Sequence, residues 1–269
     1  MKIGRRDQRS SSISTANAKT ILIRGRDLTA DLVGSVSFAE HFWLLLTGGL
    51  PTHAQSRILD AALVAIAEHG MVPSVQVSRM TFAAAPDSLQ GAVAAGILGC
   101  GSVILGASED AGRFFSLIDE HMSAGMTMEL AASQAIQGFC RAKRPIPGYG
   151  HPLHKDHDPR VGRLFAIAAE NKGDDKHVRI ALEVESQLPV ITGKALALNV
   201  SGAIPAVLLD AGFPLLALRG VPILARTAGL IAHLLEERTR PIGFVMSQAA
   251  AEAIEYDGEA PPGFQSDEA

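Results

Sequence analysis

The chain has 269 residues, 47% of them hydrophobic and 19% charged, with a formal net charge of −4. This composition is typical of a folded globular protein and excludes a largely disordered chain. The slightly negative charge excludes a global basic field that would attract nucleic acid, so local arginines and histidines must hold any anionic substrate.

Most of the chain is predicted to be helical, and only residues 21–23 suggest a strand, in a small hairpin. Ser37 and Glu40 form a capping box before an apolar run that ends at two glycines, and Thr52 and Gln55 repeat the capping pattern. The apolar stripe over 58–66 follows one face of a helix that ends at Gly70.

Asp87 is predicted to cap a third helix that runs through Leu105. Its glycines at 91, 96, 99 and 101 indicate close helix packing or close approach of the backbone to a ligand. Asp158 followed by proline predicts another helix start. The acidic tail after Tyr256 is expected to fray. Further helices are predicted near 109–123, 127–142, 158–171 and 175–188, from about 201, and over 220–238.

Three features bear on the compartment. Cys100 and Cys140 have no C-x-x-C spacing, so the sequence predicts neither a disulfide framework nor a zinc site. Residues 1–12 are polar and basic, which predicts no secretory signal. We find no run of about 18 apolar residues without a charge and expect no membrane span. We therefore expect a cytoplasmic protein.

The loop over 145–152 differs from its helical surroundings because it is rich in proline and glycine. It carries His151 and is followed by Lys155 and Arg160. A rigid loop that bears ionisable groups between helices is a typical place for function. This loop is therefore the first candidate for a site.

The segment P-G-Y-G-H-P-L-H-K-D-H-D-P-R at 147–160 resembles the signature of the citrate synthase family, which is G-x-G-H, a basic residue and D-P-R at fixed spacing. In length the chain resembles citryl-CoA lyase and the lyase module of ATP-citrate lyase more than a full citrate synthase. Other segments that resemble family motifs are R-G-R-D-L at 24–28, L-T-G-G-L-P-T at 46–52, E-H-G at 68–70, A-R-T-A-G-L-I-A-H at 225–233 and R-P at 240–241.

The resemblance implies an all-α, citrate-synthase-like fold and a homodimer. A large helical domain would comprise 1–107 and 212–269, and a smaller helical domain, 108–211, would close over the site. The implied partners are a CoA thioester, as substrate, and a polycarboxylate or oxo acid. No metal or redox cofactor is implied, and neither is binding to nucleic acid or membrane.

The resemblance also assigns two histidines. His151 would contact the hydroxyl or carbonyl oxygen at the centre of the polycarboxylate, where a neutral imidazole can take or give a proton. His69 would bind a substrate carboxylate or hydroxyl. From the residues alone, each has an alternative: His151 as a loop histidine with a structural hydrogen bond, and His69 as a histidine that favours the helix dipole.

The implied anion-binding residues are basic side chains and a loop backbone. Arg160, Arg226 and Arg240 would hold carboxylates, since guanidinium forks suit them, and Arg240 would reach the partner subunit's site. The backbone of Gly148, Tyr149 and Gly150 would meet the adenine end of CoA. Lys155 would meet a CoA phosphate, or else be a solvated surface lysine.

Two positions depart from the family pattern. Ile104 stands where citrate synthase has a histidine that hydrogen-bonds the thioester enolate. Lyase members of the family also lack that histidine, so this departure points toward cleavage rather than synthesis. Ser201 stands at the proton-transferring aspartate. A serine hydroxyl is far too weak a base to replace a carboxylate, and Ser201 could instead cap a helix. Glu109 and Asp210 are nearby acids that could substitute.

The sequence therefore predicts a citryl-CoA lyase-like enzyme that cleaves or forms a C–C bond between an acetyl-CoA-type thioester and an oxaloacetate-type oxo acid. In cleavage His151 would remove the hydroxyl proton. One alternative is a non-catalytic paralogue that binds a CoA ester, and another is an enzyme of the same fold that acts on a different acyl-CoA.

Overall fold

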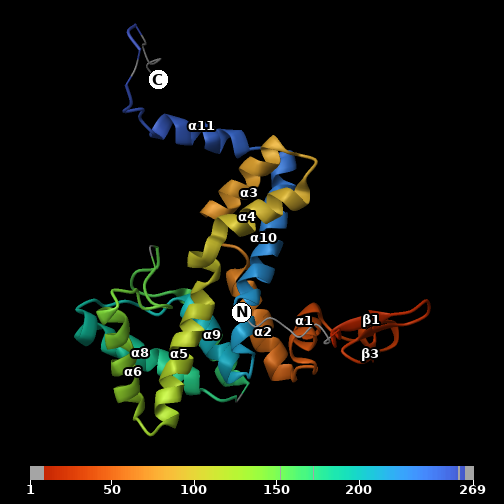
Figure 1. The fold of residues 1–269 in the computed structure, drawn as a ribbon, viewed down its shortest axis with the longest axis vertical. Helices are drawn as coiled ribbons and strands as arrows, with labels where there is room; N and C mark the ends of the chain where they lie inside the picture. The colour runs from red at the N-terminus through yellow and green to blue at the C-terminus, as the bar shows by residue number, and fades with distance from the viewer. Residues whose placement is uncertain (1–8, 152, 172, 260, 264–269) are drawn as a thin grey trace. The chain divides into compact units, whose positions relative to one another are not determined.

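The computed structural model describes residues 9–259 and 261–263, apart from 152 and 172. Within these residues the chain forms eleven α-helices and one small sheet, which confirms the predicted all-α class. The elements follow in chain order (Figure 1): β1 Ser14–Ala16, β2 Ile21–Ile23, β3 Arg26–Asp27, η1 Leu28–Leu32, α1 Phe38–Thr47, α2 His53–Ala67, α3 Pro73–Ala84, α4 Leu89–Leu105, α5 Ala107–Ser123, α6 Met128–Arg141, α7 Pro159–Glu170, α8 Lys176–Thr192, α9 Val200–Asp210, η2 Leu215–Ala217, α10 Gly220–Thr239 and α11 Gly243–Ala253.

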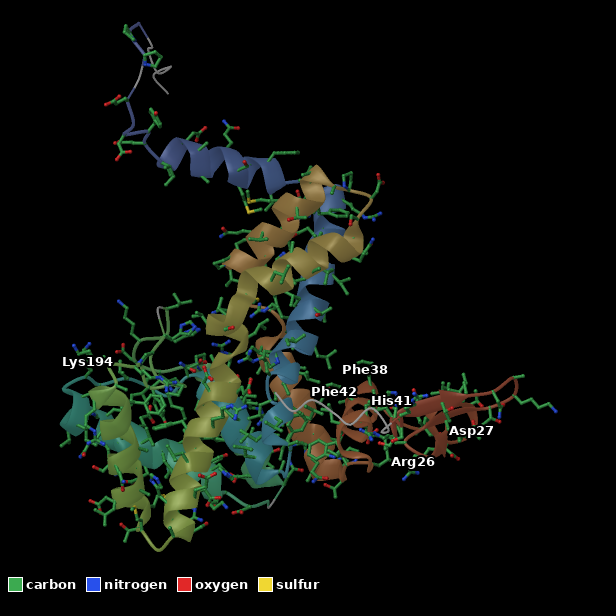
Figure 2. All side chains as sticks on the ribbon, in the orientation of Figure 1. Arg26, Asp27, Phe38, His41, Phe42 and Lys194 are labelled. Atoms are coloured by element: carbon green, nitrogen blue, oxygen red, sulfur yellow. The ribbon has the colours of Figure 1, made fainter. Side chains whose placement is uncertain are left out.

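The N-terminal segment confirms the local signals read from the sequence. β2 pairs antiparallel with both β1 and β3, so the strand predicted at 21–23 lies in a hairpin. The Asp27 side chain, labelled in Figure 2, caps the short helix η1 by accepting from two backbone N–H groups. Ser37 and Glu40 complete the capping box of α1, which ends at Gly48 with φ 84°. Only glycine adopts that conformation without strain.

The chain divides into two compact units. One comprises 1–65 with 107–221, and the other 66–106 with 222–269. We call these unit 1 and unit 2. The domains predicted from the resemblance, 1–107 with 212–269 and 108–211, are defined by a closing motion. A single conformation does not test a motion, so that division stays a prediction.

Unit 1 is built around α9. Eight of its eleven residues are buried, as expected for a helix that is apolar on all sides. It packs against α5, α7 and α8, and α6 packs against α5 and α8 (Figure 1). Phe115 of α5 meets Tyr149 of the proline- and glycine-rich loop in an edge-to-face contact with ring centroids 6.4 Å apart. This core fixes the start of α9 beside that loop.

Unit 2 contains α3, α4, α10 and α11. The predicted close packing at the glycines is confirmed at Gly96, where an added Cβ would lie 2.7 Å from the Leu230 side chain of α10. Gly101 has φ 55° and ψ −169°, and it breaks α4 into two helical pieces. Asp87 does not cap α4, so that prediction is wrong: the cap position is Ser88, whose side chain makes no capping bond. Asp87 stands one residue too early to reach the first helical N–H groups.

The other predicted helices correspond to α5, α6, α7, α8, α9 and α10, with ends displaced by a few residues. Asp158 caps α7 with Pro159 at its first turn, as predicted. Helices α3 and α11 were not predicted, because α3 has a weak apolar face and α11 mixes alanines with exposed apolar residues. Cys100 and Cys140 are both free thiols, in agreement with the absence of a disulfide framework.

Two helical stretches, 89–123 and 215–239, are long and apolar enough to cross a membrane. Buried helices of water-soluble proteins pass the same test, and 33% and 39% of the two apolar windows are buried inside the fold. Length and composition alone do not distinguish these cases. The expectation of no membrane span therefore stays a prediction.

Candidate functional site

The residues that the sequence singled out fall into two groups. Those in unit 1 are Gly148, Tyr149, Gly150, His151, Lys155, Arg160 and Ser201, and those in unit 2 are His69, Arg226 and Arg240. In unit 1 the structure joins the loop of Gly148, Tyr149 and Gly150 to the segment that leads to Ser201. In unit 2, Arg226 lies in α10 and Arg240 directly follows its last residue, so about 20 Å of helix separates the two arginines.

The loop before His151 is joined to the segment before α9 by backbone bonds. Asn199 donates from its backbone N–H to the Gly148 carbonyl oxygen (2.9 Å) and from its side-chain amide to the Gly150 carbonyl oxygen (2.6 Å). Gly150 donates to the Ala197 carbonyl oxygen (2.8 Å). The buried Tyr149 hydroxyl donates to a carbonyl oxygen of α8 (2.8 Å). His151 and Ser201 are thus held on two adjoining segments.

Glycines permit this contact. Gly148 has φ +90°, and an added Cβ there would lie 2.9 Å from the Gly202 Cα. An added Cβ on Gly202 would lie 2.8 Å from the Gly148 carbonyl oxygen. Separations under about 3 Å are not tolerated between a Cβ and backbone atoms. The G-x-G of the loop and the glycine after Ser201 therefore form one close backbone contact.

His151 has a defined orientation. Its Nδ1 accepts from the backbone N–H of Leu153 (3.1 Å) and of His154 (3.0 Å). Its ring also stacks on the His154 ring with centroids 4.7 Å apart. Because both N–H groups donate to Nδ1, the proton of the neutral imidazole is on Nε2. In this arrangement His151 presents a donor at Nε2.

Ser201 lies in the first turn of α9 but does not cap it, so the helix-cap alternative is wrong. Asn199 is the capping residue, and its side chain accepts from the backbone N–H of Ser201 (2.9 Å) and of Gly202 (3.3 Å). The asparagine stands outside the helix, where its side chain can turn back onto these N–H groups. Ser201 is left at the positive end of the α9 dipole, which favours negative charge.

Arg160 is held by the buried Asp158 two residues earlier. Arg160 Nε and Nη2 bond the two carboxylate oxygens (2.9 and 2.8 Å), and the Val200 backbone N–H donates to Asp158 Oδ2 (2.9 Å). Burial raises the pKa of Asp158, but the bonds from Arg160 and Val200 outweigh it and lower the pKa from 3.8 to about 2. Asp158 therefore joins Arg160 to the start of α9.

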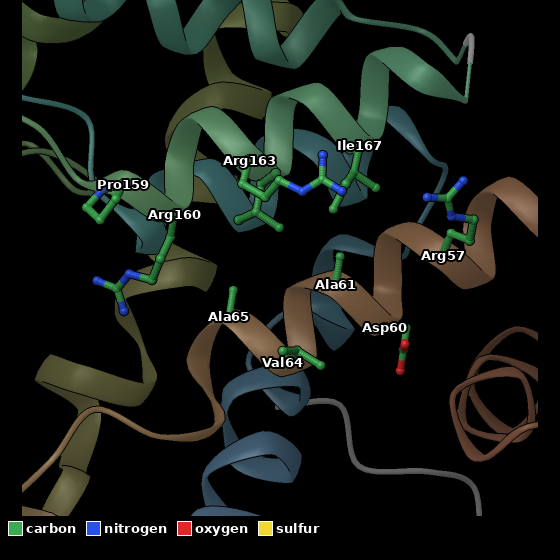
Figure 3. A pocket seen from close by; sticks show the side chains of 10 residues that line it. Arg57, Asp60, Ala61, Val64, Ala65, Pro159, Arg160, Arg163 and Ile167 are labelled. Carbon is green, nitrogen blue, oxygen red and sulfur yellow. The ribbon is translucent and has the colours of Figure 1, made fainter.

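A pocket of about 550 Å³ adjoins Arg160, between α2 and α7 of unit 1. Figure 3 shows Arg160 and Arg163 on α7, with Arg57 on α2 at the opposite end of the pocket from Arg160. Glu170 pairs with both Arg57 (3.3 Å) and Arg163 (3.2 Å) at the rim. Asp60, Pro159 and alanine, valine, leucine and isoleucine side chains form the rest of the lining. The pocket thus combines three arginines and one carboxylate with an apolar wall.

In unit 2, His69 belongs to a turn at the end of α2. Glu68 Oε1 accepts from the backbone N–H of His69 (2.9 Å) and of Gly70 (2.5 Å). Gly70 has φ +75°. An added Cβ on Gly229 would clash with the Ala67 carbonyl oxygen, so this glycine lets α10 pack against the turn. His69 itself is partly buried.

The two arginines of unit 2 differ in exposure. Arg226 is buried, and its Nη1 has no hydrogen-bond partner among the residues that the structure describes. A buried guanidinium nitrogen without a partner is costly, so Arg226 suits an anionic ligand. The Arg240 side chain is 81% exposed and lies 3.9 Å from Glu236. Its backbone carbonyl oxygen accepts from Arg79 (2.9 Å).

The remaining predicted positions are less informative. Lys155 is exposed, and Ile104 is 42% exposed near the break in α4. The hydrogen bond from Arg113, opposed by partial burial and aided by Arg219, lowers the pKa of Glu109. Asp210 accepts from His177 Nδ1 (2.7 Å) and from two backbone N–H groups at the start of α8. Both acids are thus already engaged, which weakens them as substitutes for the family's aspartate.

Sequence reasoning missed several residues that hold the site: Glu68, Arg79, Asn199 and His233. Asn199 was detectable, since asparagine immediately before a helix is a strong capping signal. Arg79 and His233 carry no local signal, because their partners are distant in sequence. Among the described residues, no three histidine, cysteine or acidic side chains lie close enough together to hold a metal ion.

Comparison with known proteins places this geometry in a family. The family model for the citrate synthase C-terminal domain matches residues 37–243. The solved citryl-CoA lyase from Hydrogenobacter thermophilus is 37% identical, with a TM-score of 0.82 over 95% of this chain and 97% of that one. The ATP citrate lyase of Methanothrix soehngenii, solved with citrate and coenzyme A, is 23% identical with a TM-score of 0.76 over 98% of this chain and 44% of that one, which shows the fold alone.

Curated relatives are longer. A probable ATP-citrate synthase of Dictyostelium discoideum is 28% identical over 221 residues, which is 74% of this chain and 33% of the relative. The 2-methylcitrate synthase of Shewanella oneidensis is 25% identical over 202 residues, 74% of this chain and 51% of the relative. The chain thus spans between about a third and a half of the length of these relatives. Because the family model covers most of its length, the chain belongs to the citrate synthase family.

Proposed function

We propose that this chain is a citryl-CoA lyase-like enzyme that cleaves, or forms, the C–C bond between an acetyl-CoA-type thioester and an oxaloacetate-type oxo acid. The observation that carries this proposal is the 37% identity with a citryl-CoA lyase over nearly the whole of both chains. Relatives named for 2-methylcitrate leave the acyl group open.

Cleavage requires a defined movement of electrons and protons. The hydroxyl proton leaves the central oxygen, the C–C electron pair moves to the thioester as an enolate, and a carbonyl forms on the oxo acid. The enolate carbon then takes up a proton to give acetyl-CoA. We propose that His69, Arg160, Arg226 and Arg240 hold the carboxylates, with the unpaired Nη1 of the buried Arg226 as the strongest support. As written, no step requires a metal or a redox cofactor.

We propose that His151 donates to the central oxygen. With Nδ1 occupied by two backbone N–H groups, Nε2 carries the ring proton and can donate a hydrogen bond to the carbonyl oxygen or to the alkoxide oxygen that forms from it. Removal of the hydroxyl proton, the role expected for cleavage, would require Nδ1 to lose these bonds and become protonated. The described arrangement therefore favours stabilisation of the oxygen anion by a hydrogen bond, in either direction of the reaction.

Ser201 and Ile104 limit how the enolate is handled. Neither side chain is a useful base, and isoleucine cannot donate a hydrogen bond. We propose that the Ser201 hydroxyl, at the positive end of α9, donates a hydrogen bond to the substrate. The acetyl carbon then exchanges its proton with water or another acid. This assignment keeps Ser201 catalytic without giving it the role of the family's aspartate.

We further propose that the CoA thioester meets the loop at Gly148, Tyr149 and Gly150, with Lys155 at a phosphate. The exposed lysine and the rigidly bonded loop support this. A homodimer in the cytoplasm remains part of the proposal. Exposed apolar side chains on α4, Leu98 and Val103, support an interface with a second copy because they would be costly to leave in water.

The second candidate is a non-catalytic paralogue that binds a CoA ester, and Ile104 and Ser201 favour it. An enzyme for another acyl-CoA is a third. The test incubates the protein with citryl-CoA, and separately with acetyl-CoA plus oxaloacetate, and follows free thiol and oxo acid. The lyase proposal expects turnover that His151→Ala lowers by at least about 10². Calorimetric binding of CoA without turnover on either substrate set would favour the binding protein.

A further inference from the structure

Arg79 on α3 is almost completely buried, yet its side chain carries a full charge and several bonds. Nε bonds Glu237 (2.6 Å), Nη1 bonds Glu236 (2.8 Å) and Nη2 bonds the Arg240 carbonyl oxygen (2.9 Å). Nη1 also lies 3.4 Å from His233 Nδ1. A buried guanidinium is tolerated only when its donors are satisfied in this way.

One branch of these contacts holds the connection between α10 and α11. Glu237 is buried beside Arg79, and its Oε1 accepts from the backbone N–H of Ile242 (2.9 Å) and of Gly243 (2.7 Å). An added Cβ on Gly243 would lie 2.8 Å from the Arg79 carbonyl oxygen. The Arg79–Glu237 pair therefore fixes the backbone on both sides of Arg240.

The other branch leads to His69. A guanidinium can only donate, so His233 Nδ1 accepts from Arg79 and the ring proton lies on Nε2. Nε2 then donates to Glu68 Oε2 (3.0 Å). Burial raises the pKa of Glu68, but the bonds from His233 and from the Gly70 N–H outweigh it and lower the pKa. The Glu68 carboxylate is thus available to hold the His69 turn.

We propose that Arg79 and His233 are positioning residues for the polycarboxylate site. Through Glu68 and Glu237 they hold two segments that are distant in sequence, each with a residue assigned to substrate: His69, and Arg240, which would reach the partner subunit's site. Both branches end on backbone groups of these segments. This role rests on the proposed function, because His69 and Arg240 matter to the reaction only if they bind the polycarboxylate.

A matched pair of variants at His233 separates positioning from packing. In His233→Gln, the amide oxygen and nitrogen are about as far apart as the two ring nitrogens. The oxygen can therefore accept from Arg79 while the nitrogen donates to Glu68. In His233→Leu both bonds are lost while the apolar bulk remains. Arg79 keeps its bonds to Glu236, Glu237 and the Arg240 carbonyl oxygen in both variants.

The first readout does not depend on activity. Amide hydrogen exchange of His69 and Gly70, followed by NMR on the full chain, should become about tenfold faster in His233→Leu, as for the loss of about one hydrogen bond. In His233→Gln it should stay within about twofold of the wild type. Glu68→Ala, at a half-exposed position, should reproduce the leucine variant and provides the test if that variant does not fold.

The second readout is the KM for oxaloacetate with acetyl-CoA as co-substrate. His233→Leu should raise this KM about tenfold and leave the KM for acetyl-CoA unchanged. In His233→Gln both KM values should stay close to those of the wild type. Unchanged amide exchange in both His233→Leu and Glu68→Ala, or equal defects in His233→Gln and His233→Leu, overturns the proposal. If the wild type turns over neither substrate set, the proposed function is refuted instead. The amide exchange rates alone then decide whether Arg79 and His233 position the His69 turn.

Discussion

Replacing Asp158 by asparagine should both destabilise the fold and loosen Arg160. The carboxylate accepts two bonds from the Arg160 side chain and one from the Val200 N–H, and it is buried. An amide offers one acceptor and turns a donor toward groups that can only donate. The substitution therefore removes charge-assisted bonds and leaves at least one buried N–H without an acceptor.

The pKa of Asp158 sets the size of the effect. A change from 3.8 to about 2 on folding corresponds to a stabilisation on the order of 2 kcal/mol at neutral pH. An unsatisfied buried N–H adds about 1–3 kcal/mol to the cost. Because the folded pKa is the lower one, the carboxylate's contribution is fully present above about pH 4 and is lost as the pH falls toward about 2.

Urea unfolding of the wild type and of Asp158→Asn at pH 7 and at pH 2.5 measures this. We expect a difference of about 2–4 kcal/mol at pH 7 that shrinks markedly at pH 2.5. Asp156→Asn, an exposed carboxylate two residues earlier, is the matched control and should change stability by less than about 0.5 kcal/mol. An equal difference at both pH values, or a loss no larger than that of the control, would refute the role assigned to Asp158.

Three further substitutions test the site. Gly202→Ala should lower the free energy of unfolding in urea by about 1–3 kcal/mol, because its Cβ would lie 2.8 Å from the Gly148 carbonyl oxygen. The control Gly138→Ala, on a helix where an added Cβ meets nothing within 4 Å, should be neutral or stabilising. Equal effects of the two substitutions would contradict the close contact. Arg226→Lys should raise the KM for oxaloacetate at least about tenfold, since one ammonium cannot replace a buried guanidinium fork, and an unchanged KM would remove this residue from the site. Ser201→Asp restores a carboxylate at the favourable end of α9 and should raise turnover of acetyl-CoA plus oxaloacetate by about 10² in a site that still closes; inactivity of both wild type and variant would favour the binding protein.

The sequence predicted most of the helices because their signals are local. The capping boxes at Ser37 and Thr52 and the cap at Asp158 are satisfied by neighbours within three residues, so they can be recognised without knowledge of the fold. Asp87 gave a wrong prediction because it was judged from a local signal alone, and aspartate is common in turns as well as at helix starts. Helix α3 was missed because it lacks a clear apolar stripe and is held by partners distant in sequence, such as Glu236 and Glu237, which bond its Arg79.

The site was predicted less completely than the fold. The resemblance supplied the residues whose side chains would meet substrate, and the structure joins the His151 loop to the segment that carries Ser201. It could not supply the protonation of His151, which depends on two backbone N–H groups that reach Nδ1. The capping role of Asn199 could be read from the sequence. The hydrogen bond from its side-chain amide to the Gly150 carbonyl oxygen could not, because it joins residues 49 apart in sequence. Such bonds follow from the fold and not from local pattern.

The spacing of D-P-R has a physical reason that the motif alone does not reveal. Asp158 caps α7, which places Pro159 in the first turn, where its missing N–H costs nothing, and puts Arg160 within reach of the same carboxylate. The other lone pairs of that carboxylate hold Val200 at the start of α9. A glutamate would displace all four of these bonds by a methylene, and a residue inserted before the arginine would turn its side chain to another face of α7. Aspartate at that spacing is therefore needed to fix an arginine relative to the segment that carries Ser201.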